Sequence, residues 1–92
     1  MMKRNVASKK IEFKIAAPSA KRVAIAGDFN QWKPDALTAK KDKNGIWKAS
    51  ATIPTGTHEY KFIVDGSWIT DPICSHKRSN VFGSENSILE VR

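Results

Sequence analysis

The chain has 92 residues, 40% of them apolar and 27% charged, and a formal net charge of +7. These values predict one globular domain with a small core and exclude a disordered chain. We expect neither a membrane span nor a secretory signal, because no apolar run approaches the roughly 20 residues that cross a bilayer. Cys74 is the only cysteine, which excludes an internal disulfide and favours a reducing, cytoplasmic setting.

The chain begins with a polar segment and then shows regular alternation. Residues 1–8 are polar and charged without periodicity, which predicts a flexible basic tail before a single domain of residues 9–92. In KKIEFKIAA, residues 9–17, apolar side chains alternate with Lys and Glu, as in a half-buried strand. KRVAIAG, residues 21–27, repeats this alternation and ends at a glycine. We therefore expect two strands here, separated by a Pro-Ser turn.

The middle of the chain contains a further pair of strands. ALTAKK, residues 36–41, predicts a short strand that leads to Asn44-Gly45, a strong indication of a two-residue hairpin turn. In IWKASATI, residues 46–53, Trp47 and every second residue after it fall on one face.

The last third of the chain continues in the same way. HEYKFIV, residues 58–64, alternates and is followed by Asp65-Gly66, a second hairpin turn. SWIT is expected to return as a short strand, residues 71–80 read as a loop, and NSILEV, residues 86–91, reads as the closing strand. No helical period appears in the sequence. Short strands separated by turns predict an all-β fold, an immunoglobulin-like antiparallel β-sandwich.

The three tryptophans fall into two groups. Trp47 shares a face with other apolar residues of its strand, so we expect it in the core. Trp32, in DFNQW, and Trp68, in VDGSW, each follow a polar turn, where the chain is expected near the surface. Phe29 is expected to point inward and anchor the first turn. The two outer rings either cap the ends of the sandwich or form an exposed apolar patch, which usually marks a binding site.

Two exposed indoles suit either of two ligands. The C–H face of a pyranose packs flat on an indole, and its removal from water is favourable by roughly 25 cal/mol per Å². The sugar hydroxyls then need partners, because an unpaired buried one costs about 1–3 kcal/mol. A nucleic-acid base stacks on the same rings for about 1–3 kcal/mol. The rings alone do not choose between sugar and base.

Longer motifs narrow this choice. GDFNQW, PTGTHEYKFIVDGSWITDP and NSILEV fit the patterns G-x-F-N-x-W, P-x-G-x-H-x-Y-K-F-x-V-D-G-x-W-x-x-D-P and N-x-I-x-x-V. In this combination, nearly the whole chain resembles the family 48 carbohydrate-binding modules. That family includes the glycogen-binding domain of the AMP-activated protein kinase beta subunit and the N-terminal modules of branching and debranching enzymes. The resemblance implies a sandwich of the early-set type and non-catalytic binding of α-1,4-linked glucans such as glycogen or starch.

The resemblance also implies roles for six side chains. Trp32 and Trp68 are expected to be the stacking platforms. Hydrogen bonds to sugar hydroxyls are expected from Lys61, Ser84 and Asn86. Phe82 takes the place of a leucine that threads the bend of the glucan, where it could add a third stacking surface or turn inward. The alternation of residues 58–64 would also expose Lys61 if it had no role in binding.

The chain offers little for catalysis. Asp28, Asp65 and Asp71 each lie in a turn, which is the usual structural use of Asp. His58 and His76 have no Cys or carboxylate at metal-ligand spacing, and no phosphate loop or nucleophile motif occurs. We therefore expect no enzyme activity, no cofactor and no metal. The expected partners are an α-glucan and a glucan-metabolising enzyme or kinase.

Grouped positive charge supports an alternative function. Basic residues gather at the start of the chain, at residues 40–43 and at residues 77–78, and a well-solvated surface is the simplest interpretation. The alternative hypothesis is an adaptor that uses its basic face for an acidic protein or a nucleic acid. A nucleic acid is the less favoured partner, because no basic group coincides with a recognised binding motif. Salt separates the hypotheses, since polyanion binding weakens steeply with salt and binding to a neutral glucan does not.

Overall fold

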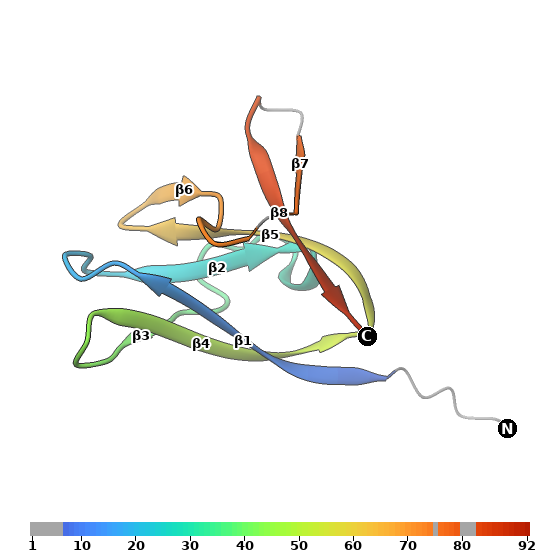
Figure 1. Cartoon of the computed structure of the whole chain (residues 1–92), viewed down its shortest axis with the longest axis horizontal. Helices are drawn as coiled ribbons and strands as arrows, with labels where there is room; N and C mark the ends of the chain where they lie inside the picture. The colour runs from blue at the N-terminus through green and yellow to red at the C-terminus, as the bar shows by residue number, and fades with distance from the viewer. Residues whose placement is uncertain (1–6, 75, 80–82) are drawn as a thin grey trace, which may run out of the picture.

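The structure is a computed structural model that describes residues 7–74, 76–79 and 83–92. Its strands form two antiparallel sheets that face each other as the layers of a sandwich (Figure 1). The strands are β1 (Ser8–Ala16), β2 (Val23–Gly27), β3 (Lys40–Lys41), β4 (Ile46–Pro54), β5 (Gly56–Val64), β6 (Ser67–Ile69), β7 (Lys77–Ser79) and β8 (Glu85–Val91). The predicted all-β, immunoglobulin-like antiparallel sandwich is confirmed.

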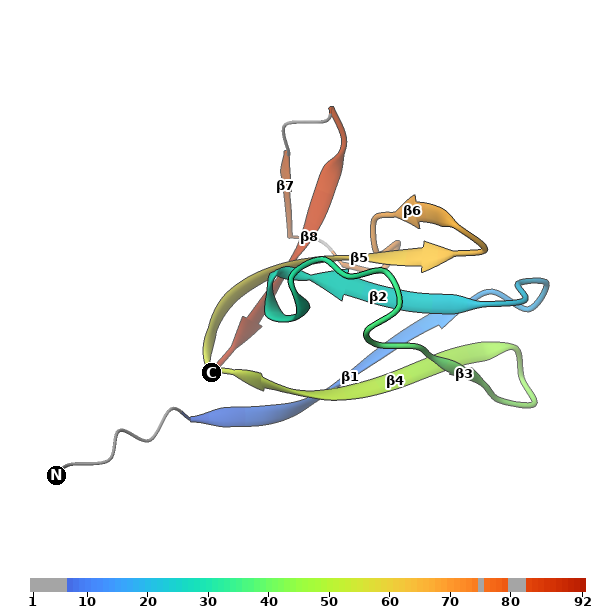
Figure 2. The same cartoon turned by 180° about the vertical axis from the view of Figure 1, so that it is seen from behind.

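Strand β5 is central to the larger of the two sheets. The strand order in this large sheet is β2-β5-β8-β7, and β6 also pairs with β5. Strand β8 pairs with β5 from Gly56 to Tyr60, whereas β6 pairs with its last residues, Phe62 to Val64. The small sheet has the order β1-β4-β3. Seen from opposite sides, the β7–β8 hairpin extends beyond the two layers (Figure 1, Figure 2).

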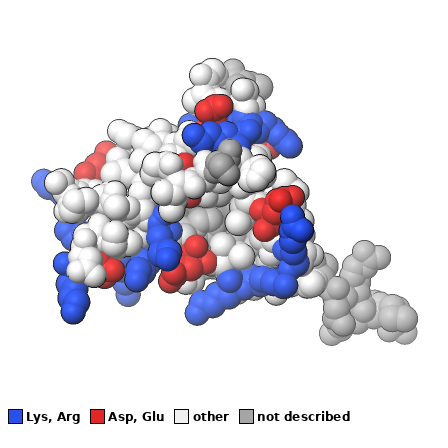
Figure 3. Space-filling view, in the orientation of Figure 1, with Lys and Arg blue, Asp and Glu red and all other residues white. Residues whose placement is uncertain are grey.

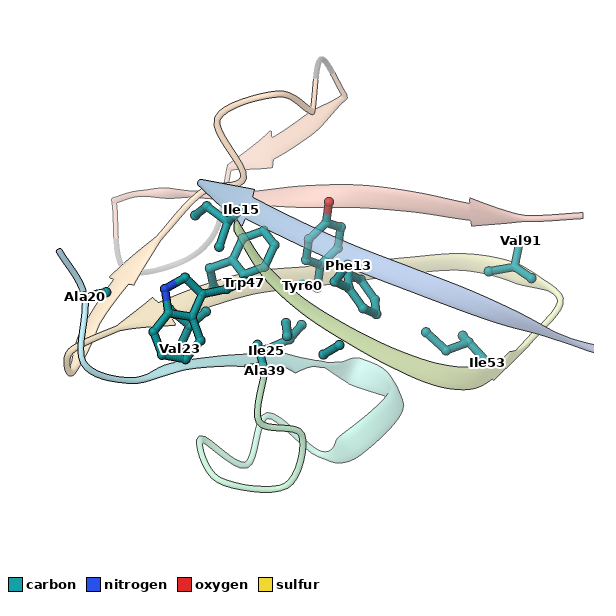
Figure 4. Packing of buried hydrophobic residues seen from close by; sticks show 12 residues of the cluster. Phe13, Ile15, Ala20, Val23, Ile25, Ala39, Trp47, Ile53, Tyr60 and Val91 are labelled. Carbon is teal, nitrogen blue, oxygen red and sulfur yellow. The ribbon is translucent and has the colours of Figure 1, made fainter. Parts of the chain in front are cut away.

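The core lies between the sheets and follows the alternation of the strands. Phe13 of β1 contacts Tyr60 of β5 edge-on, with 5.1 Å between the ring centroids. Trp47 of β4 is 8% exposed and its indole N–H donates to the carbonyl oxygen of Ala17 at 2.9 Å, so the prediction that Trp47 is a core residue is confirmed. The buried cluster, drawn in Figure 4, consists of Phe13, Ile15, Ala20, Val23, Ile25, Ala39, Trp47, Ala49, Ile53, Tyr60, Phe62 and Val91.

Both predicted hairpins are present, but their turns differ. Asp65 and Gly66 have φ angles of 49° and 86°, and they form the two-residue connection between β5 and β6. The β3–β4 turn is longer, because Asp42 is part of it and its carboxylate accepts hydrogen bonds from the backbone N–H groups of Asn44 and Ile46, at 2.8 and 3.0 Å. The side chain of Asp42 thus selects a longer turn than the Asn-Gly pair alone predicts.

Two sequence expectations need correction or adjustment. Residues 71–80 were expected to be a loop, yet Lys77–Ser79 form β7, which pairs with β8. All three residues of β7 are exposed, so no apolar alternation marks this strand, and it forms because β8 offers it an unpaired edge. Strand β1 begins one residue before the predicted domain start at residue 9, a difference within the usual uncertainty of strand ends. Most of the predicted tail, residues 1–6, lies outside the described residues.

Candidate functional site

The DFNQW segment forms a tight turn at the end of β2, and Asn30 holds this turn together. Residues Asp28–Asn30 make a single turn of 3₁₀ helix. The side-chain oxygen of Asn30 accepts a hydrogen bond from the backbone N–H of Gly27 at 3.0 Å, and its amide nitrogen donates to the carbonyl oxygen of Ile25 at 3.1 Å. The turn is therefore fixed to the strand from which it starts.

Phe29 packs this turn against the sandwich, and Gly27 leaves the space that this packing requires. Phe29 stacks on Phe13 with 5.7 Å between the ring centroids and packs against the core, so the prediction that it points inward is confirmed. Gly27 makes that approach sterically feasible, because a Cβ atom there would lie 2.6 Å from the carbonyl oxygen of Glu59 and closer still to the ring of Phe29. Close approach, rather than an unusual φ angle, requires glycine at this position, since its φ is −163°.

Trp32 follows in an unusual backbone conformation. Gln31 and Trp32 have φ angles of 57° and 58°, a left-handed region that costs of order 1–3 kcal/mol for each residue other than glycine. The backbone N–H of Trp32 donates to the carbonyl oxygen of Gly27 at 2.9 Å, which closes the turn. The indole is half-buried and packs on a small cluster formed by Ala24, Ala26 and Ile63. This cluster is separate from the core cluster between the sheets.

Trp68 lies on the same side of the large sheet. In β6 it is directly opposite Ile63 of β5, and Ile63 is directly opposite Ala24 of β2. Directly opposite residues of an antiparallel pair project from the same face. Trp68, which is 44% exposed, therefore shares with Trp32 the face formed by Ala24 and Ile63. We call this outer face of the large sheet the aromatic face; neither of its indoles belongs to the core cluster.

Lys61 belongs to the aromatic face but is covered. It is directly opposite Ala26 and therefore points outward, yet it is only 7% exposed. The expectation that strand alternation exposes Lys61 is wrong, because the strand is central in its sheet and the ammonium group reaches a neighbour. Its Nζ donates to Oγ of Ser84 at 2.9 Å. Lys61 and Ser84, both predicted from the sequence, are thus in direct contact.

Asn86, another predicted site residue, lies in β8 and is 8% exposed. Its side-chain nitrogen donates to Oε1 of Glu59 at 3.0 Å, and the guanidinium of Arg78 donates to Oε2 of the same carboxylate at 3.0 Å. Glu59 is two residues before Lys61 in β5, so both project from the aromatic face. The remaining predicted residue, Phe82, lies outside the described residues.

A hollow of about 340 Å³ adjoins the aromatic face. Ala24 and Ile63, two residues of the cluster under Trp32, form part of its lining. Arg22 and Asp35 add a guanidinium and a carboxylate, and Pro34 and Gly66 complete the lining. The hollow therefore combines apolar surface with groups able to hydrogen-bond a polar ligand.

Comparison with known proteins identifies the family. Residues 10–92 match the family model described as the glycogen recognition site of AMP-activated protein kinase. The chain belongs to this family. It is therefore a carbohydrate-binding module, a non-catalytic domain, as the motifs indicated.

Several curated proteins are similar to this module. The beta-1 subunit of 5'-AMP-activated protein kinase from Sus scrofa is 36% identical over 72 residues, which are 78% of the module and 56% of that protein. The beta-1 subunit from Rattus norvegicus has the same identity, and the aligned part is 25% of its length. Protein PTST homolog 2, chloroplastic, from Arabidopsis thaliana is 38% identical over 73 residues, 79% of the module and 13% of that protein. The module thus spans only part of each of these relatives.

The carboxylates that were considered as catalytic candidates bind backbone or side-chain donors of the module. Asp28 accepts from the backbone N–H of Glu59 at 3.0 Å and contacts the His58 ring at 2.9 Å. Asp65 accepts from the backbone N–H groups of Lys21 and Arg22, both at 2.8 Å.

Asp71 is the third of these carboxylates and is 7% exposed. It accepts hydrogen bonds from the hydroxyl of Tyr60 and, at 3.1 Å, from the backbone N–H of Ile73. Burial and the contact with Asp71 raise the pKa of Tyr60 above its ordinary value, so Tyr60 stays protonated. In the part of the module that the structure describes, no group of three or more His, Cys, Asp or Glu residues could hold a metal ion, and no helix is long and apolar enough to cross a membrane.

Sequence reasoning did not identify Glu59, Arg78 or the small cluster under Trp32 as parts of the site. The two alanines of β2 carry a usable indication, because small side chains at alternate positions leave room for a large ring on that face. No such pattern marks Glu59 and Arg78. Their contact joins residues 19 positions apart and depends on the pairing of β7, a strand without apolar alternation.

Proposed function

We propose that the module binds an α-1,4-linked glucan, such as glycogen or starch, on the aromatic face. The supporting observation is the position of the indoles of Trp32 and Trp68, which lie outside the core on one sheet face and are both adjacent to the cluster that contains Ile63. The family match supports the same ligand class.

Stacking provides the affinity in this proposal. The C–H faces of two glucose units pack on the two indoles, with roughly 25 cal/mol gained for each Å² of apolar surface removed from water. The strained backbone of Gln31 and Trp32 holds one of these rings in place before the ligand arrives. Phe82 is proposed from the sequence as a third contact with the glucan.

Hydrogen bonds provide the orientation. Lys61 in β5 donates to Ser84 in the segment before β8, and Asn86 in β8 donates to Glu59, which is two residues before Lys61. We propose that Lys61, Ser84 and Asn86 bind hydroxyl groups at the edges of the sugar rings. A base would stack on the same indoles for a similar free energy, and the family match favours the sugar.

The binding is expected to place the module, and any protein linked to or associated with it, on the polysaccharide. The similar beta-1 subunits are named as parts of a protein kinase, which supports a kinase as such a partner, and a glucan-metabolising enzyme is the other partner that we propose. One of the similar proteins is chloroplastic, so the cytoplasmic location of this module stays a prediction.

Titration with maltoheptaose, a soluble α-1,4-glucan, tests the proposal. Trp68→Ala should weaken binding by about tenfold or more, since a stacked ring contributes about 1–3 kcal/mol and about 1.4 kcal/mol is a factor of ten. Ile73→Ala is the matched control, because Ile73 is the other large apolar side chain exposed among the described residues, at 80%. Calorimetry at low and high salt gives the affinities. Equal binding by Trp68→Ala and the unchanged protein would contradict the proposal.

A further inference from the structure

The outer face of the small sheet carries lysines that lie directly opposite one another. Lys14 of β1 is paired with Lys48 of β4, and Lys48 is paired with Lys40 of β3. All three are exposed. Directly opposite side chains have Cβ atoms about 4.5–5.5 Å apart, and like charges in such positions are destabilising. The mutual repulsion of these three lysines lowers the stability of the folded state. A bound anion would relieve this repulsion.

Neighbouring residues extend the row into a larger polar surface. Lys10 precedes Lys14 by four residues in β1, so it projects from the same face, and it is paired with Thr52. Phe13 and Trp47 point the other way, into the core. Figure 3 shows Lys and Arg along the lower edge of the molecule, where Figure 1 places β1, β3 and β4. We call Lys10, Lys14, Lys40 and Lys48 the lysine face.

The charges of the lysine face are only partly balanced. Lys14 lies 3.9 Å from Glu12, and Lys48 lies 3.6 Å from Asp42. The lysine side chains of both pairs are about half exposed, so these contacts contribute little. Within the described ranges, no ion pair involves Lys10 or Lys40. A net positive charge thus remains on a surface without apolar anchors.

We propose that the lysine face docks an acidic protein segment, a stretch rich in Asp and Glu. Carboxylates placed between the lysines would replace repulsion by attraction, and this complementarity is the source of the affinity. The chemistry favours carboxylates over nucleic acid. The aromatic side chains of these strands, Phe13 and Trp47, point into the core, so the lysine face offers no ring on which a base could stack.

The lysine face and the aromatic face belong to different sheets. The lysines project from β1, β3 and β4, whereas Trp68, Lys61 and Asn86 project from β6, β5 and β8. The two faces point away from each other across the core and share no residue. An acidic partner and a second ligand on the aromatic face can therefore bind at the same time. The inference does not depend on what the aromatic face binds.

Binding of fluorescent poly-L-glutamate tests the inference, with fluorescence anisotropy as the readout. The triple variant Lys14→Thr, Lys40→Thr, Lys48→Thr should bind at least tenfold more weakly than the unchanged protein. The matched control changes three exposed lysines outside this face, Lys21→Thr, Lys33→Thr and Lys77→Thr, with the same loss of charge. It should lose no more than about threefold, because unpaired surface charges act mainly through screened long-range attraction. Equal losses in the two variants would overturn the inference.

Two further measurements complete the test. Thermal melting should show the lysine-face variant at least as stable as the unchanged protein, so that weaker binding is not explained by unfolding. Duplex DNA serves as the second polyanion, and tighter binding of DNA than of poly-L-glutamate through the same lysines would overturn the choice of an acidic protein. Saturating maltoheptaose should leave the affinity for poly-L-glutamate unchanged, whereas competition between them would contradict the separation of the two faces.

Discussion

The side-chain nitrogen of Asn86 donates a hydrogen bond of 3.0 Å to Glu59, whose other carboxylate oxygen accepts from Arg78 at 3.0 Å. The amide of Asn86 therefore has a defined orientation, set by a residue of β5 and a residue of β7. Glu59 acts as a positioning residue for the proposed sugar contact, although it has no expected contact with the sugar itself.

Replacement of Glu59 should therefore weaken glucan binding indirectly. We expect Glu59→Ala to lower the affinity for maltoheptaose about fivefold, since the amide of Asn86 loses the acceptor that orients it. Glu59→Gln should recover most of this loss, because its side-chain oxygen still accepts the hydrogen bond. Calorimetric titration measures both variants. Equal weakening by the two replacements would show that charge at residue 59, rather than the orientation of Asn86, is what matters.

Gly27→Ala should destabilise the fold at the base of the Trp32 turn. A methyl group there meets the carbonyl oxygen of Glu59 at 2.6 Å and the ring of Phe29, so backbone or ring must shift. We expect a loss of about 2 kcal/mol or more in the free energy of unfolding, from urea denaturation.

Gly66→Ala is the informative comparison for that measurement. The space around Gly66 is open but its φ is +86°, so the expected cost is the left-handed backbone alone, about 1–2 kcal/mol. A smaller effect at Gly27 than at Gly66 would argue against the steric explanation.

The stability of the domain should fall as the pH rises above about 6.5, because of His58. Burial alone would lower the pKa of His58, but hydrogen bonds to the carbonyl oxygen of Pro54 and to the carboxylate of Asp28 together raise it above 6.5. Only the imidazolium can donate to both acceptors at once. A raised pKa in the folded state gives stability that is complete below about pH 6.5 and is lost as the pH passes through the folded value.

Thermal melting between acidic and mildly alkaline pH checks this. The unchanged protein should melt at a lower temperature on the alkaline side, and His58→Gln should flatten that dependence. His76→Gln is the control for the replacement itself, because His76 is the other histidine of the chain and is exposed. A profile that stays steep in His58→Gln would assign the effect to another group.

Lys40→Thr should make the domain slightly more stable. Lys40 is directly opposite Lys48 and, in the residues described, forms no ion pair, so its removal relieves repulsion without a lost contact. Opposed pairs in sheets typically contribute roughly 0.2–1 kcal/mol, and we expect a gain of a few tenths in urea denaturation. The gain should shrink at high salt, where the charges are screened. A salt-independent gain would indicate better strand propensity instead.

The sequence predicted the fold well where one face of a strand is buried and the other is wet. Alternation in β1 and β4 identified the inward residues, among them Trp47, because the side-chain period of a strand is directly visible in such segments. Alternation predicted an exposed side chain for Lys61, which is buried. The reason is that neighbours cover the outer face of β5, so both faces of this part of the strand are buried.

The site was harder to predict than the fold. Trp32, Trp68, Lys61, Ser84 and Asn86 were all predicted from the motifs, and in the structure they lie on the outer side of the large sheet, where their role in binding stays a proposal. The hydrogen bonds that Glu59 forms with Asn86 and Arg78 were not predicted, because they depend on which strands become neighbours in the sheet. Strand pairing over long sequence distances leaves no local pattern in the residues themselves.

Strand β5 carries Glu59, Lys61 and Ile63 outward and Tyr60 and Phe62 inward. Deletion or insertion of a single residue between Gly56 and Asp65 would exchange these two sets, sending charge into the interior and aromatic rings into water. Among natural variants of this domain, length changes should therefore be absent from this strand and confined to connections such as residues 33–39.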